Sequence, residues 1–160
     1  ETSILGRKGR AWEELSKPFR VAEDVLLSGA ILGGLDRELR QAIRRLRESK
    51  GKIENDVKER IGGFAALLET ARQVARGAAR DLDGGKRGTD VEARIVAVHL
   101  IAETLQESLR GILEESPGRR PAGPDASGDD IARLIGLGMY ASRVRLRKWG
   151  DTLLIGKEKS

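Results

Sequence analysis

Apolar side chains recur at unbroken steps of four and three residues from Thr89 to Glu115, which is the spacing of one face of an α-helix. The residues on these steps are Val91, Ile95, Val98, Ala102, Leu105, Leu109 and Ile112. Val96, Leu100 and Ile101 widen this face, and a helix with so wide an apolar face must be covered by several neighbours. The sequence therefore predicts a central helix over residues 89–115 and, with it, an all-α helical bundle.

Other segments with helical patterns extend the prediction to a bundle of about five helices in a single domain of 160 residues. We expect the first helix to begin after the N-cap Ser16 and to end at Gly33-Gly34. Its apolar residues, which we expect in the core, are Phe19, Ala22, Val25, Leu26, Gly29 and Ile31.

A second helix is predicted through Leu35–Ile61, with Asp36 as its cap. Gly62-Gly63 is expected to end or kink this helix and to connect it to a third helix over residues 64–82. The apolar seam of the second helix consists of Leu39, Ile43, Leu46, Ile53 and Val57.

The two ends of the chain and one loop complete the expected organisation. Residues 1–15 form an extended basic N-terminal arm, and residues 116–128 form a long loop that holds three of the four prolines. Residues 129–160 form a C-terminal helix and tail. The residues of this helix that we expect to face inward are Ile131, Leu134, Ile135, Gly138, Met139 and Ser142.

Arginines form stripes on two of the predicted helices. Arg37, Arg40, Arg44 and Arg47 share one face over about 15 Å, on a different side from the apolar seam. A second stripe on residues 64–82 comprises Arg72, Arg76 and Arg80. Across a short Gly62-Gly63 connection, the two stripes would form one side of a phosphate clamp. Solvated helix faces show the same spacing, so both interpretations stay open.

The composition agrees with an anionic partner. The chain has 30 basic and 25 acidic residues, a net charge of +5, and 21 of its basic residues are arginine. Arginine binds phosphate as a planar fork, which favours it for polyanion recognition. Further cations lie in the arm (Arg7, Lys8 and Arg10) and in the glycine-rich turn at Lys86 and Arg87. Many arginines and glutamates with no cysteine and one methionine are typical of proteins from hot environments.

No catalytic or metal-binding motif is present, and we expect neither enzymatic activity nor a cofactor. The paired acids, such as Glu13/Glu14 and Asp129/Asp130, are adjacent and therefore point in different directions on a helix. His99 has no second ligand at metal-binding spacing, so we expect it in the core or beside it. No apolar run approaches the roughly 20 residues of a membrane span, and no signal peptide is expected.

The two tryptophans each stand beside a basic cluster, at opposite ends of the sequence. Tryptophan and arginine are favoured at protein interfaces, so Trp12 and Trp149 are candidate subunit contacts. The apolar tail residues Leu153, Leu154 and Ile155 lie outside the strongest helical pattern and are further candidates. In the alternative interpretation, each tryptophan only covers an end of the bundle.

In architecture and charge distribution the chain resembles the major capsid proteins of filamentous and rod-shaped archaeal viruses. The features that carry the resemblance are an all-helical chain of this size, an ordered basic arm and the arginine stripes at Arg37–Arg47 and Arg72–Arg80. The resemblance implies a virion protein that wraps double-stranded DNA through its phosphates. It also implies assembly into a helical filament with copies of itself or with a related second capsid chain.

Two alternatives remain open from the sequence. The segment LDRELRQAIRRLRESKGKI resembles the first basic hairpin helix of archaeal division proteins related to membrane-remodelling ESCRT-III, which implies a cytoplasmic scaffold on anionic membrane. The third interpretation is a helical adaptor whose arginines pair with an acidic protein.

Overall fold

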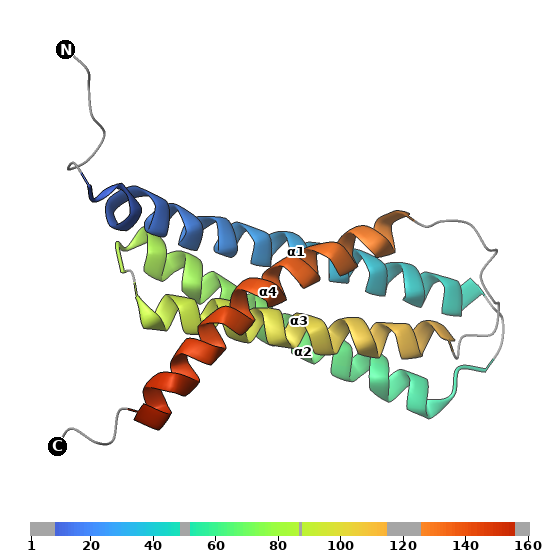
Figure 1. Cartoon of the computed structure of the whole chain (residues 1–160). Coiled ribbons are helices and arrows are strands. Elements are labelled where there is room, and N and C mark those ends of the chain that lie inside the picture. Colours follow the sequence, from blue (N-terminus) through green and yellow to red (C-terminus); the bar gives the residue numbers. More distant parts are fainter. Residues whose placement is uncertain (1–8, 49–51, 87, 115–125, 156–160) are drawn as a thin grey trace, which may run out of the picture.

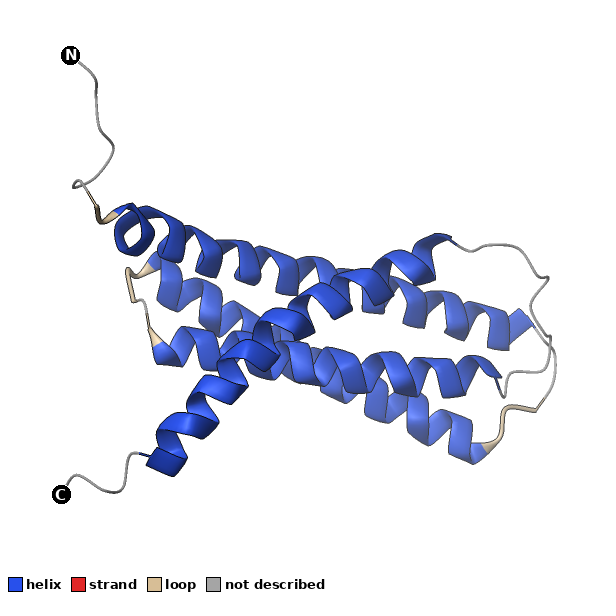
Figure 2. Cartoon of the chain, in the orientation of Figure 1, coloured by secondary structure: helices blue, strands red, loops and turns tan. Residues whose placement is uncertain are grey.

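The computed structural model describes residues 9–48, 52–86, 88–114 and 126–155, and most of these residues are helical (Figures 1 and 2). The elements are η1 (Trp12–Ser16), α1 (Lys17–Glu48), α2 (Asn55–Asp83), α3 (Thr89–Glu114) and α4 (Ala126–Ile155). The all-α prediction is confirmed, with four α-helices and one π-helical turn in the described part instead of about five helices. Most of the predicted arm and loop lie outside the described residues.

The first glycine pair does not end a helix. Gly33-Gly34 lies inside α1, so the prediction of a helix end there is wrong. Packing explains Gly34, because a methyl carbon built on it would lie 2.8 Å from Cγ1 of Ile131 on α4. The glycine therefore permits a close approach of two helices, and this approach offsets the low helix propensity of glycine.

The predicted helix Leu35–Ile61 is divided, because α1 ends at Glu48 and α2 begins at Asn55. Gly62-Gly63 lies within α2, where the sequence predicted an end or kink. The hairpin turn between the helices thus falls about ten residues earlier than predicted. Asp36 is not a helix cap but a residue in the middle of α1.

Helix α2 runs antiparallel to α1 and to α3, and α4 lies across α1 and α3 (Figure 1). Helix α3 contacts all three other α-helices, in line with the central position predicted for it. The main core contains Leu35, Phe64, Leu105 and Ile135, one from each helix. A smaller cluster near the start of α1 joins Val21, Ala78, Val91 and Ile95.

The helix ends also differ from the prediction. The helical chain starts before Ser16, which lies in η1 and is not an N-cap. Helix α4 begins at Ala126, inside the predicted loop, and its last turn contains Leu153 and Leu154, which were predicted to lie outside a strong helix. No helix among the described residues is long and apolar enough to cross a membrane.

His99 is buried, as predicted, and bridges three helices. Its Nε2 lies 3.2 Å from Oγ of Ser28 on α1, and its Nδ1 lies 2.9 Å from Oγ of Ser142 on α4. The Ser28 hydroxyl donates to the carbonyl oxygen of Asp24, so it accepts from Nε2–H, and the Ser142 hydroxyl donates to Nδ1. On α4, Gly138 leaves room for the ring: a methyl carbon there would lie 3.0 Å from it. The neutral histidine therefore forms a hydrogen bond with each of the two serine hydroxyl groups.

The substitutions Gly34→Ala and Gly63→Ala add the same methyl group with different expected effects on stability. Nothing lies within 4 Å of the added carbon at Gly63, so higher helix propensity should raise the free energy of unfolding by about 0.5–1 kcal/mol. At Gly34 the contact with Ile131 should cost about 1–3 kcal/mol and cancel that gain. Urea denaturation measures both values, and equal stabilisation by the two substitutions would contradict the close approach.

The pKa of His99 should lie below its usual value of about 6.5. Burial lowers this pKa, and the charge of Asp24 and a hydrogen bond to the Gly138 backbone offset burial only in part. The unfolded chain then takes up a proton near pH 6.5 while the folded chain stays neutral. The contribution of the neutral His99 to stability is therefore complete above about pH 6.5 and is lost as the pH falls towards its folded pKa.

Because His99 is the single histidine, NMR of its ring protons measures the folded pKa directly. Urea denaturation between about pH 7 and pH 5 tests the linkage, and in His99→Gln the pH dependence in this window should largely disappear. A His99 that titrates at or above 6.5 would show that the buried bridge does not favour the neutral ring.

Candidate nucleic-acid interface

The exposed face of α1 changes its chemistry along the helix. In the second half, the exposed residues include Arg37, Arg40, Arg44 and Arg47, and the buried residues include Leu39 and Leu46. In the first half, Phe19 and Leu26 are exposed, although the sequence predicted both in the core. One face of a single helix is thus apolar near its start and basic near its end.

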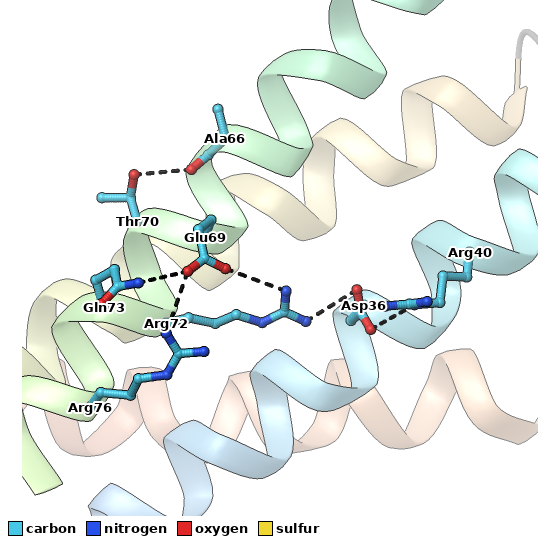
Figure 3. Close-up of polar contacts among 8 residues, drawn as sticks. All are labelled: Asp36, Arg40, Ala66, Glu69, Thr70, Arg72, Gln73 and Arg76. Carbon is cyan, nitrogen blue, oxygen red and sulfur yellow. Dashed lines mark hydrogen bonds and ion pairs between the residues drawn. The ribbon is translucent and has the colours of Figure 1, made fainter.

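The two arginine stripes meet at Asp36, which accepts contacts from both helices (Figure 3). Arg40 Nε donates to Asp36 Oδ2 over 2.9 Å, and Arg72 Nη2 on α2 lies 3.1 Å from Asp36 Oδ1. Burial raises the pKa of the Asp36 carboxyl group, but the hydrogen bonds and charges of Arg40 and Arg72 outweigh burial and lower the pKa overall. Asp36 therefore stays ionised and ties α1 to α2.

Glu69 on α2 continues this network (Figure 3). Its carboxylate lies 3.7 Å from Nη1 of Arg72 and 3.4 Å from Nη1 of Arg76, and it accepts a hydrogen bond of 2.7 Å from Gln73. These contacts partly neutralise Arg72 and Arg76 within the molecule. The α2 stripe is thus engaged mainly with acids of its own chain.

The two stripes follow one another along the hairpin. Because Arg72 lies beside Asp36, the α2 stripe extends from that point towards Arg80, and the α1 stripe extends the opposite way towards Arg47. At 1.5 Å per residue, they form one line of about 28 Å along the hairpin. The expectation that Gly62-Gly63 connects the two stripes is wrong, because α1 ends at Glu48, α2 begins at Asn55 and Gly62-Gly63 lies inside α2.

Three stripe arginines have no ion-pair partner among the described residues: Arg44, Arg47 and Arg80. Arg37 lies 3.9 Å from its neighbour Glu38, a distance at which a solvated pair contributes little. Arg44, Arg47 and Arg80, together with Arg37, are therefore the stripe residues best placed to bind an external anion, and all but Arg80 lie on the outer face of α1.

The other predicted cations divide into paired and undescribed residues. Arg10 lies 3.6 Å from Glu14, and Lys86 lies 3.3 Å from Asp81. Arg7, Lys8 and Arg87 lie outside the described residues.

The predicted subunit contacts gather at one end of the bundle, where α1 begins and α4 ends (Figure 1). Trp12, Leu153 and Leu154 are exposed. Trp149 is half-buried and lines a cleft of about 770 Å³ between the start of α1, the start of α3 and the end of α4. The side chain of Ile155 lies outside the described residues.

Sequence reasoning missed the long-range acid–arginine contacts. Arg145 on α4 pairs with Asp24 on α1, and its Nε lies 4.0 Å from Glu92 on α3. Only the contact between Asp36 and Arg40 had a local signal in the sequence, because residues four apart are neighbours on a helix.

Among the described residues, no group of three histidine, aspartate or glutamate side chains is placed to hold a metal ion.

Replacing Asp36 with Asn should lower the free energy of unfolding by about 1 kcal/mol at pH 7, because two half-exposed arginine contacts weaken together. The folded pKa of Asp36 is lowered, so its contribution is present above the unfolded pKa of about 4 and is lost as the pH falls through the folded pKa. The stability difference from the parent chain should therefore shrink at about pH 3. Urea denaturation at both pH values measures it.

Glu107→Gln is the matched control, because Glu107 is exposed on α3 and has no ion pair among the described residues. Its effect should stay within about 0.5 kcal/mol at both pH values. Equal effects of the two substitutions would show that Asp36 does not join α1 to α2.

No protein-family model matches the chain, and neither a curated protein nor a solved structure is significantly similar to it. Its function therefore has to be inferred from its own residues.

Proposed function

We propose that this chain is a structural protein that coats double-stranded DNA by binding its phosphates. The observation that carries the proposal is the exposed second half of α1. Arg44 and Arg47 have no ion-pair partner in the described part of the chain, and exposed Arg37 and Arg40 extend the same surface. The planar guanidinium fork matches the geometry of phosphate and loses less side-chain freedom per hydrogen bond than an ammonium group does.

A duplex suits this surface better than a single strand. The α1 stripe is about 15 Å long, and a duplex carries about one negative charge per 1.7 Å of its axis, so several phosphates fall within reach. Binding of single strands commonly uses stacked aromatic side chains. The exposed aromatic residues Trp12 and Phe19 lie at the other end of α1, and Tyr140 lies on α4. Contacts of this kind position a protein without reading the base sequence.

Assembly into a helical filament is the second part of the proposal, and in its most specific form the chain is a virion major capsid protein. The support is the separation of two surfaces on one molecule. Phosphate contacts would use the arginine half of α1, while Trp12, Leu153 and Leu154 offer exposed apolar contacts at the opposite end of the bundle. A subunit can therefore bind DNA and a neighbouring subunit at the same time.

An anionic membrane is the second candidate partner, for a scaffold of the ESCRT-III kind. Arg37 and Arg44 share the outer face of α1 with Phe19 and Leu26, and helices that lie on membranes combine cationic and large apolar residues in this way. Against it, the cationic and apolar residues of α1 follow one another along the helix and do not form two parallel faces. An acidic protein that pairs with the arginines remains a third candidate.

The double substitution Arg44→Glu/Arg47→Glu tests DNA binding. The affinity for a duplex of about 30 base pairs, measured by fluorescence anisotropy at low salt, should fall at least about tenfold. The slope of log K against log salt should decrease by about 2, since each phosphate contact contributes close to one unit. Circular dichroism should show unchanged helicity, because both side chains are exposed.

The control Arg110→Glu/Arg133→Glu makes the same change in net charge at exposed positions of α3 and α4. It should reduce affinity much less. If both double substitutions weaken binding equally, binding reflects net charge alone. If the parent chain binds anionic vesicles but no duplex, the membrane candidate replaces the proposal.

A further inference from the structure

Turn η1 and the first half of α1 carry large apolar side chains that no other part of the described chain covers. On α1, Phe19 is 65% exposed and Leu26 is 75% exposed; in the π-helical turn η1, Trp12 is 59% exposed and Leu15 is 42% exposed. The spacing of seven residues places Phe19 and Leu26 on the outer face of α1, away from buried Val21 and Ser28. Each such side chain would gain about 1.5–3 kcal/mol from burial, so the face is suited to a partner.

We infer that this face pairs with the same face of a second copy, as an antiparallel helix pair about a two-fold axis. The pattern of large and small residues is self-complementary about a point midway between Ala22 and Glu23. A two-fold axis at that point places Phe19 opposite Leu26 of the second copy. It also places Leu15, in η1, near Ala30 of the second copy.

The small residues opposite the large ones are open towards the outside. Ala30 and Gly33 are exposed, and a methyl carbon built on Gly33 would meet no atom within 4 Å. Internal packing therefore gives no reason for glycine at this position, in contrast to Gly34. Helices pack at an interaxial distance of about 8–10 Å, so a small residue such as Ala30 leaves room for Leu15 of the second copy.

Charges on the edge of the face are complementary in the same arrangement. Arg20 and Glu23 are exposed on the side of α1 that faces α4, and neither has an ion-pair partner in the described part of the chain. A two-fold axis perpendicular to the helices keeps each edge against the same edge of the second copy. Arg20 of one copy then lies beside Glu23 of the other, and this contact occurs twice.

The size of the contact is that of a weak dimer. The paired segment from Leu15 to Ala30 is about 22 Å long. The phenylalanines and leucines are already partly buried in the monomer, so their pairing buries less than the roughly 1,200 Å² of a standard interface. Arg44 and Arg47 lie outside the paired segment, so the pairing does not depend on DNA binding.

The dissociation constant of the dimer, measured by sedimentation equilibrium of the full chain, tests the inference. The parent chain should be a dimer, and Leu26→Asp should raise the dissociation constant at least about 30-fold, as expected for a central contact. Leu137→Asp is the matched control, because Leu137 is 64% exposed on α4 and lies outside the proposed interface. It should leave the dissociation constant nearly unchanged.

Two further variants separate this arrangement from a general apolar attraction. Ala30→Gln changes an exposed residue of the monomer but should weaken the dimer strongly, because glutamine would collide with Leu15 of the second copy. Arg20→Glu and Glu23→Arg should each weaken it about fivefold, and the double exchange should restore it. A monomeric parent chain, or a dimer insensitive to Leu26→Asp and Ala30→Gln, would overturn the inference whether or not the chain binds DNA.

Discussion

The close contact of α4 with α1 and α3 determines which surfaces this molecule presents. Two glycines make it possible, Gly34 against Ile131 and Gly138 against the ring of His99. With α4 this near, Ser28, His99 and Ser142 can form one buried chain of hydrogen bonds across three helices. Buried polar groups are costly unless they are paired, so this chain also fixes the register in which α4 crosses the other two helices.

Helices α2, α3 and α4 all contact α1, and the side of α1 that none of them covers carries exposed residues from Phe19 to Arg47. Asp36 pairs with Arg40 and with Arg72 on α2. Arg44 and Arg47 lie about two to three helical turns beyond Asp36 and have no ion-pair partner among the described residues. The open face therefore has an apolar half and a half whose cations are largely uncompensated.

Helix α3 could be predicted almost to the residue, because its apolar pattern is unbroken. The glycine pairs at Gly33-Gly34 and Gly62-Gly63 were misread because helix propensity is a local quantity, whereas the reason for Gly34 is a side chain almost one hundred residues away. In the same way, Phe19 and Leu26 looked like core residues. Apolar spacing identifies a face of a helix but does not say whether the chain itself covers that face.

The candidate site was predictable in part for the same reason. The arginines could be placed on one side of a helix by their spacing, and on α1 they do lie on the exposed side. Their partners could not be found, because Arg72 and Asp36 are neighbours only once the chain has turned between α1 and α2. Knowing these partners reduces the candidate phosphate ligands of the stripes from seven arginines to four, which are Arg37, Arg44, Arg47 and Arg80.

This smaller set suits the two proposed roles, DNA binding and assembly. Arginines already paired within the chain give up one partner to gain another, so they add little to the affinity for phosphate. Unpaired arginines repel one another in the free protein, and a polyanion relieves that repulsion on binding. An apolar surface gains from burial against another protein and gains nothing from phosphate. Placing Arg44 and Arg47 at one end of α1, and Phe19 and Leu26 at the other, therefore lets one helix contribute to both interactions without competition between them.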